Sequence, residues 1–132
     1  MNSMRVVLWC GALGLLWAGP VLVGTPAGAS GVSAETRALF EKHCKKCHGL
    51  DGRGQTAQGK KLKLPDWADP QLQAAKTDED LLQRILQGYQ DPENTDRKMK
   101  SFKDELTEAQ ARDLVQVVRA FGKPPGPFAE EK

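Results

Sequence analysis

Two cysteines and a histidine lie together in the run Cys44, Lys45, Lys46, Cys47 and His48. Residues three positions apart on a helix share a face, so the two sulfur atoms would point in one direction. Each thiol can then form a thioether with one vinyl group of a haem, and the neighbouring imidazole can ligate the iron. This C-x-x-C-H spacing is a c-type haem attachment signature. The sequence therefore predicts one covalently bound haem c, attached at Cys44 and Cys47, with His48 as the proximal iron ligand.

Two other kinds of site also use a C-x-x-C pair, a zinc site and a thioredoxin-type dithiol. A structural zinc ion needs two further Cys or His ligands, and only His43 lies beside the motif. A redox dithiol usually lies near a βαβ pattern, which the sequence lacks. Both alternatives are therefore less well supported than haem attachment.

Met99 is the candidate for the second axial ligand of the iron. Beyond the first 29 residues it is the only methionine, and the only other histidine, His43, is predicted on the same helix as His48. Met99 lies in an irregular stretch between two predicted helices, where a loop can bring its thioether over the distal face. The alternative is a methionine packed in the core, but its charged neighbours Lys98 and Lys100 show no apolar periodicity.

Three helices would position these residues. The first follows Ser33 as N-cap, carries the cysteines near its end and stops at the glycine-rich stretch that begins at Gly49. The second starts at Thr77 with a capping box and stops at Gly88.

The third helix begins at Thr107, also with a capping box, and ends at Gly122. No segment alternates between apolar and polar residues in the manner of a strand. The sequence therefore predicts an all-α protein, whose connections of about 30 residues need a cofactor to organise them.

The ends of the chain differ from this central part in composition. Arg5 precedes an apolar run from Val6 to Val23, followed by the small residues 27–29, which is the pattern of a signal peptide. An uncleaved anchor is the alternative. We therefore predict a signal peptide over residues 1–29, a haem domain over 30–122 and a proline-rich, extended tail over 123–132.

Length and charge narrow the function further. A chain of 132 residues has room for one small domain, and a formal net charge of +2 lacks the basic excess of nucleic-acid-binding domains. The charge falls in blocks: residues 37–63 hold eight basic and two acidic side chains, residues 64–96 hold two basic and eight acidic, and residues 97–103 hold four basic and no acidic. The basic blocks predict docking to an acidic redox partner, the alternative being an ordinary solvated surface.

Residues from Ser33 to Gly122 resemble the class I monohaem cytochromes c. The resemblance rests on the aromatic residue Phe40 before the C-x-x-C-H-G motif of residues 44–49, and on the glycine-rich turn of residues 51–54. It rests also on a middle helix over 77–88, a methionine loop with Met99 and Phe102, and a terminal helix over 107–121. It implies that the first and last helices cross, that haem is wrapped with one edge exposed, and that His48 and Met99 hold the iron. It also implies an electron carrier of the bacterial periplasm.

The chain departs from the family pattern at several positions. At the helix crossing, Thr36 and Val117 replace the usual glycine and tyrosine, a larger residue facing a smaller one. The proline whose carbonyl usually orients the proximal histidine is replaced near Gly59 and Lys60, so the acceptor for His48 stays open. Trp67 has two possible roles, a hydrogen bond to a haem propionate or packing beneath its loop.

Function follows from the predicted ligation. With both axial positions filled, the iron has no vacant site for oxygen or peroxide, so the expected role is one-electron transfer by a carrier and not catalysis by an enzyme. A cytochrome c subunit of a larger oxidase or dehydrogenase is one alternative. A haem enzyme or ligand sensor with a displaceable Met99 is another. No membrane insertion is expected if the leader is cleaved.

Overall fold

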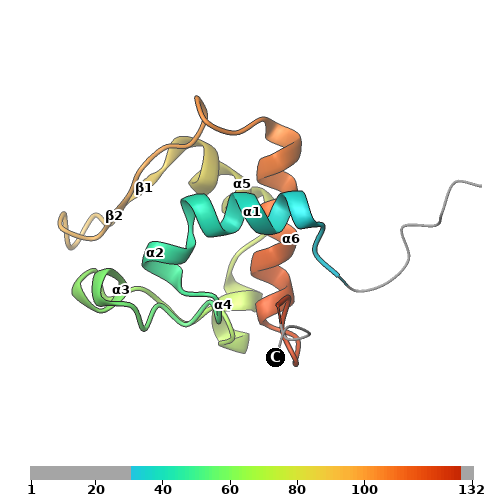
Figure 1. Cartoon of the computed structure of the whole chain (residues 1–132). Helices are drawn as coiled ribbons and strands as arrows, with labels where there is room; N and C mark the ends of the chain where they lie inside the picture. Colours follow the sequence, from blue (N-terminus) through green and yellow to red (C-terminus); the bar gives the residue numbers. More distant parts are fainter. Residues whose placement is uncertain (1–30, 129–132) are drawn as a thin grey trace, which may run out of the picture.

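The computed structural model describes residues 31–128, so the predicted signal peptide and residues 129–132 lie outside the described part. Helices dominate this part of the chain, with one short two-stranded ribbon (Figure 1). In chain order the elements are α1 (Ala34–His43), α2 (Lys45–His48), α3 (Ala57–Lys61), α4 (Pro70–Ala75), α5 (Asp78–Gln87), β1 (Tyr89–Gln90), β2 (Lys98–Met99) and α6 (Glu108–Phe121).

The three predicted helices are present with their predicted N-caps. Ser33 accepts from the amide of Thr36 at 3.1 Å, and Thr77 and Thr107 each form a complete capping box. Each cap satisfies backbone donors that a helix start would otherwise leave without a partner. The predicted boundaries of α5 and α6 are therefore confirmed.

The first helix differs from its prediction at Cys44. The backbone leaves helical geometry there, with φ −116° and ψ −37°, and the chain continues as the separate short helix α2. Cys44 thus lies at the junction of α1 and α2, while Cys47 and His48 lie on α2. One continuous helix carrying both cysteines was the wrong expectation.

The long connections hold more structure than the sequence indicates. Helices α3 and α4 lie in the segment between α2 and α5, and the antiparallel ribbon of β1 and β2 lies between α5 and α6. All four elements are six residues or shorter. Such lengths are too short for apolar periodicity to reveal them.

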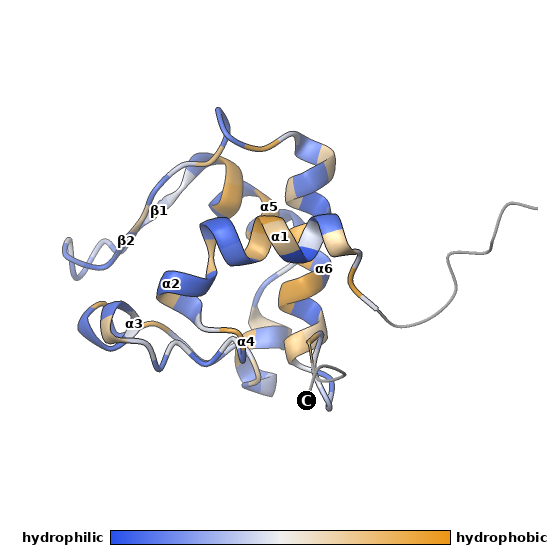
Figure 2. Ribbon diagram, in the orientation of Figure 1, coloured by the Kyte–Doolittle hydropathy of each residue, from blue (hydrophilic) through white to orange (hydrophobic). Residues whose placement is uncertain are grey.

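The core forms where α1 and α5 pack on α6 (Figures 1 and 2). Thr36 is 6% exposed and Val117 is 1% exposed, so both residues expected at the crossing of the first and last helices are buried. The largest side chains that are fully buried in this core are Phe40, Leu82, Leu114 and Val117. The all-α class is confirmed, and the crossing of the terminal helices gives the haem segment a fixed support.

The end of the chain turns back onto this core. The amide of Gly126 donates to the carbonyl of Lys123 at 2.8 Å, and the ring of Phe128 lies 5.1 Å from that of Phe40 and 5.8 Å from that of Phe121. The predicted extended tail is therefore wrong for residues 123–128, because an aromatic side chain gains more by burial than by exposure. Within residues 31–128, no helix is long and apolar enough to cross a membrane.

Candidate functional site

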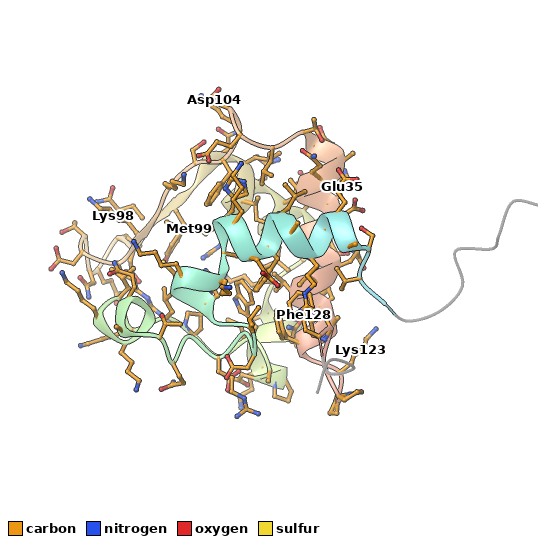
Figure 3. All side chains as sticks on the ribbon, viewed as in Figure 1. Glu35, Lys98, Met99, Asp104, Lys123 and Phe128 are labelled. Atoms are coloured by element: carbon orange, nitrogen blue, oxygen red, sulfur yellow. The ribbon has the colours of Figure 1, made fainter. Side chains whose placement is uncertain are left out.

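One cavity of about 900 Å³ lies between the α1–α2 segment and the β1–β2 ribbon. Its lining includes Cys44, Cys47 and His48 from the α1–α2 segment and Met99 from β2. Figure 3 shows Met99 on β2, with Lys98 beside it. The structure thus brings together all four residues that the sequence predicts to attach and ligate haem.

Backbone contacts fix the segment that carries the cysteines. The Thr56 hydroxyl donates to the carbonyl of Cys47 at 2.8 Å and accepts from the amide of Gly59 at 2.9 Å. The amide of Gly54 donates to the carbonyl of His48 at 2.9 Å. These three hydrogen bonds satisfy four backbone groups around the motif and hold the backbone of Cys47 and His48 against the segment 54–59.

Gly59 is required by this packing. A Cβ atom at this position would lie 2.2 Å from the carbonyl oxygen of Gly54 and 2.5 Å from that of Cys47. Any larger residue would therefore separate α3 from the motif. The sequence lacks the family's usual proline near Gly59, and the close approach gives the physical reason for a glycine at this position.

His48 is buried, with 9% of its surface exposed, and its imidazole stacks on the ring of Trp67 at a centroid distance of 3.9 Å. Burial lowers the pKa of His48 to about 4, which favours the neutral imidazole that can ligate a metal. Its Nδ1 atom has no hydrogen-bond partner among the described residues, so they supply no carbonyl acceptor for it. The ring of Trp67 also contacts Phe40 and Phe121, so Trp67 packs beneath its loop, and its other predicted role, a hydrogen bond to a haem propionate, stays a prediction.

Cys44 and Cys47 form no disulfide bond within the described residues, so both sulfur atoms are available for attachment. Burial, and then repulsion from Cys47, raises the pKa of Cys44 to about 12, so its sulfur stays uncharged. A thioether is likewise uncharged, and so this environment suits a covalent bond to a vinyl group better than a thiolate bound to zinc. Across residues 31–128, no group of three or more His, Cys, Asp or Glu side chains could hold a metal ion.

Strand register explains why Met99 faces the cavity. Tyr89 pairs with Met99 and Gln90 pairs with Lys98 in the antiparallel ribbon. Directly opposite residues point to the same face of a ribbon, and successive residues alternate. Tyr89 and Met99 are half-buried whereas Gln90 and Lys98 are exposed, so the first pair forms the inner face.

His43 is a buried neighbour of the motif. Its side chain is 4% exposed, its Nδ1 lies 3.3 Å from a carboxylate oxygen of Glu105, and its ring meets that of Phe102 edge-on. Burial is the main cause of its lowered pKa, and Nε2 has no partner in the described region. His43 lines the same cavity but lies at the end of α1, next to Cys44.

The cavity fits a haem in its size and its lining. Pockets for cofactors typically measure about 300–1,000 Å³, with mostly apolar walls and few polar groups. The apolar walls here come from Phe40, Leu62, Leu64, Pro65, Leu72, Leu81, Ile85, Phe102, Leu114 and Val118. Two thiols beside an imidazole are what covalent haem attachment requires, and the Met99 thioether is a further donor that can ligate haem iron.

Basic side chains surround this apolar cavity. Lys42, Lys46, Lys98 and Lys100 line it and are exposed. Lys76, Arg84 and Arg97 also line it but are half-buried, and Glu105 is the one acidic residue in the described lining. The basic blocks of the sequence indicate most of these lysines, whereas Arg84 and Tyr89 belong to no motif and have no signal in the sequence.

Comparison with known proteins agrees with this geometry. The sequence profile of the cytochrome c family matches residues 33–120. Among solved structures, the KustC0563 c-type cytochrome is similar, with 38% identity and a TM-score of 0.54 over 65% of this chain and 95% of that one. A point mutant of Kustc0563 gives the same identity and TM-score over 65% and 96% of the two chains. No curated protein matches.

Proposed function

Since this chain belongs to the cytochrome c family and its cofactor is covalently bound haem c, we propose that it is a periplasmic shuttle of single electrons with His48 and Met99 as axial ligands. In this proposal Cys44 and Cys47 hold the haem through thioether bonds. Electron transfer by a carrier that is not an enzyme is the role of the family. The His48–Met99 ligand pair, the periplasmic location and the shuttle role are what we propose for this chain.

One observation carries the ligation proposal, namely that the four residues line a single cavity although Met99 is 51 positions from His48. The ribbon register that turns Met99 inward supports it. His43, the other histidine of the chain, adjoins Cys44 on the same side as His48, which supports Met99 as the opposite ligand.

Haem c supplies reversible one-electron chemistry at its iron. The residues of the chain hold the group, exclude water and tune its potential. The apolar walls disfavour the additional positive charge of ferric iron, and a thioether ligand favours ferrous iron more than a second imidazole would. We therefore expect a positive reduction potential. With two protein ligands in place, no site is left for an exogenous substrate.

The exposed lysines at the cavity support docking to an acidic partner. Lys42 and Lys46 come from the α1–α2 side, and Lys98 and Lys100 come from the β2 side. Together they place positive charge on both sides of the cavity, which favours association with a negatively charged face. Localisation in the periplasm rests on the signal-peptide pattern of residues 1–29.

The ligation proposal can be tested with the holoprotein made in cells that attach c-type haem. The absorption spectrum and potential of the native protein are compared with those of Met99→Leu and His48→Ala. We expect a methionine-to-iron charge-transfer band in the native ferric protein and its loss in Met99→Leu. Rapid binding of cyanide or carbon monoxide by the native protein, without that band, would instead indicate a haem enzyme or sensor.

The docking proposal has a separate test. Lys46→Glu and Lys98→Glu should lower both the rate of electron transfer with an acidic redox protein and the dependence of that rate on salt. Lys60→Glu changes the charge equally on α3, away from the cavity lining, and is the control. Equal salt dependence in all three variants would show that the lysines are only solvated surface. Co-purification of the native protein with an oxidase or dehydrogenase would favour a subunit role over a free shuttle.

A further inference from the structure

Arg84 is a cation in an unusual place. It lies on α5, lines the haem cavity and is half-buried, with its guanidinium carbon 4.0 Å from the centre of the Tyr89 ring. In the part of the chain that the structure describes, no carboxylate lies within ion-pair distance of it. Asp80, one turn earlier on α5, is close enough for the charge of Arg84 to help lower its pKa, but it accepts hydrogen bonds from the backbone amide and the hydroxyl of Thr77. A partly desolvated guanidinium with five donors usually has an anionic or carbonyl partner.

The other basic residues of the cavity differ from Arg84. Arg97 pairs with Asp91 at 3.3 Å, and Lys100 pairs with Glu105. Lys42, Lys46 and Lys98 are exposed, so water solvates them. Lys76 is half-buried as well, but among residues 31–128 no aromatic ring lies against its ammonium group.

Tyr89 fixes the guanidinium relative to the ligand side of the cavity. Its ring is held on the inner face of the ribbon because it is paired directly with Met99. Stacking on this ring covers one face of the guanidinium and leaves the N–H groups at its edge free to donate. The planar fork is thereby prepared for a planar, two-oxygen acceptor.

Haem brings such acceptors with it, since the porphyrin carries two propionate carboxylates, which cost free energy in an apolar cavity unless they are paired. We propose that Arg84, seated on Tyr89, binds a carboxylate of the haem and so orients the group in the cavity. This inference rests on the proposed haem site and adds to it a residue on α5, far in sequence from the attachment motif.

The test uses the holoprotein and measures the reduction potential against pH. A carboxylate held by Arg84 stays ionised near neutral pH, and loss of the guanidinium should raise the pKa of that carboxyl by about 1–3 units. For Arg84→Gln we therefore expect the redox-linked pKa to rise by this amount, together with a change in the propionate bending bands of the resonance Raman spectrum. Arg84→Lys should give part of the effect, because the charge remains but the fork is lost.

Matched controls separate this role from a general charge effect. Arg53→Gln removes an arginine that is 59% exposed and does not line the cavity, and it should leave the pH dependence unchanged. Tyr89→Phe keeps the ring and should behave as the native protein, whereas Tyr89→Ala should shift the pKa in the direction of Arg84→Gln.

Three outcomes would overturn the proposal. The first is that Arg84→Gln leaves both the redox-linked pKa and the propionate bands unchanged. This includes the result that the variant protein differs from the native protein only in its association with a redox partner. The second is a shift in Lys76→Gln but not in Arg84→Gln. The third is a lower potential with no change in pH dependence, which would make Arg84 a general charge. Failure of the haem proposal itself is distinguishable, because it would appear as missing covalent haem or a missing methionine band in the native protein.

Discussion

The two sides of the cavity are built differently. The proximal segment, 44–61, is held by hydrogen bonds to its own backbone and by the close approach of Gly59 to two carbonyls. The distal segment, 89–99, is a ribbon of two residue pairs, closed by the ion pair of Asp91 with Arg97 and by backbone hydrogen bonds. Gly88 packs against its end, where a Cβ atom would lie 2.7 Å from the carbonyl oxygen of Met99. The proximal segment carries the hydrogen bonds from Thr56 and Gly54, whereas the ribbon has two residue pairs, so we expect the distal side to open more easily than the proximal side.

This difference matches the chemistry assigned to each side. Covalent attachment requires two sulfur atoms and an imidazole at fixed separations, which favours a rigid backbone. A methionine ligand needs only to reach the iron, and its thioether is a soft, neutral donor. Changes to the proximal segment should consequently damage assembly, and changes to the distal segment should alter potential and ligand access.

The largest expected effect is the loss of the attachment points. In Cys44→Ala, Cys47→Ala no thioether can form, and the large cavity would lose its covalently held filling. The remaining apolar burial should not offset the chain entropy, so the polypeptide should be largely disordered. Circular dichroism and thermal melting measure this directly. A cooperative, helical apoprotein would show that the helices fold without the haem.

The next effect concerns the fixed backbone of the proximal side. Gly59→Ala should destabilise the holoprotein by about 2–3 kcal/mol, because the added Cβ forces backbone atoms apart. Chemical denaturation measures the change. Lys60→Ala is the control, since Lys60 is the exposed neighbour on the same helix and should change little. Equal stability of the two variants would mean that α3 can move away from the motif at no cost.

These two predictions involve features that the sequence reveals unequally. The C-x-x-C-H spacing and the capping residues of α1, α5 and α6 are local signals, and each lies where it was expected. The role of Gly59 is not local, because it depends on the carbonyl of Cys47, twelve positions earlier. The break at Cys44 and the ribbon around Met99 are set by tertiary packing and have no periodic signal.

The cavity residues show the same division. Spacing alone pointed to Cys44, Cys47 and His48, and elimination pointed to Met99. Arg84 is one of many charged residues in the sequence, and its position becomes notable only because α5 turns it toward the cavity and Tyr89 covers its guanidinium. The role proposed for Arg84 depends on its place in the cavity and on the carboxylates that do not reach it. Both are known only once the packing is known.

On the distal side, Met99→Leu should leave the fold intact but lower the reduction potential. Leucine fills a similar volume, so stability should change by less than about 1.5 kcal/mol. The potential should fall by an amount on the order of 0.1 V, within the roughly 0.8 V range over which axial ligands set it. Spectroelectrochemistry measures both potential and ligation. An unchanged potential with an intact charge-transfer band would remove Met99 from the ligand set.

The smallest expected effect tests whether the ribbon limits access to the distal side. Asp91→Asn removes the charge that pairs with Arg97 at 3.3 Å, while the amide oxygen can still accept from the backbone of Glu93. Hydrogen bonds from that backbone are the main reason that the pKa of Asp91 lies below its usual value, so the carboxylate is ionised at neutral pH. Losing the pair should loosen the connection between β1 and β2 that holds Met99 inward.

We therefore expect the ferric iron of Asp91→Asn to bind imidazole roughly two- to five-fold more tightly than that of the native protein. The effect is small because the variant loses one partly exposed ion pair. Raising the salt concentration should increase the affinity of the native protein toward that of the variant, since salt screens the pair. Glu108→Gln, which removes an ion pair with Arg112 on α6, should have no such effect because neither side chain lines the cavity. If both variants bind imidazole like the native protein, the ribbon's backbone pairing alone keeps Met99 in place, and the distal side is less easily opened than its short length indicates.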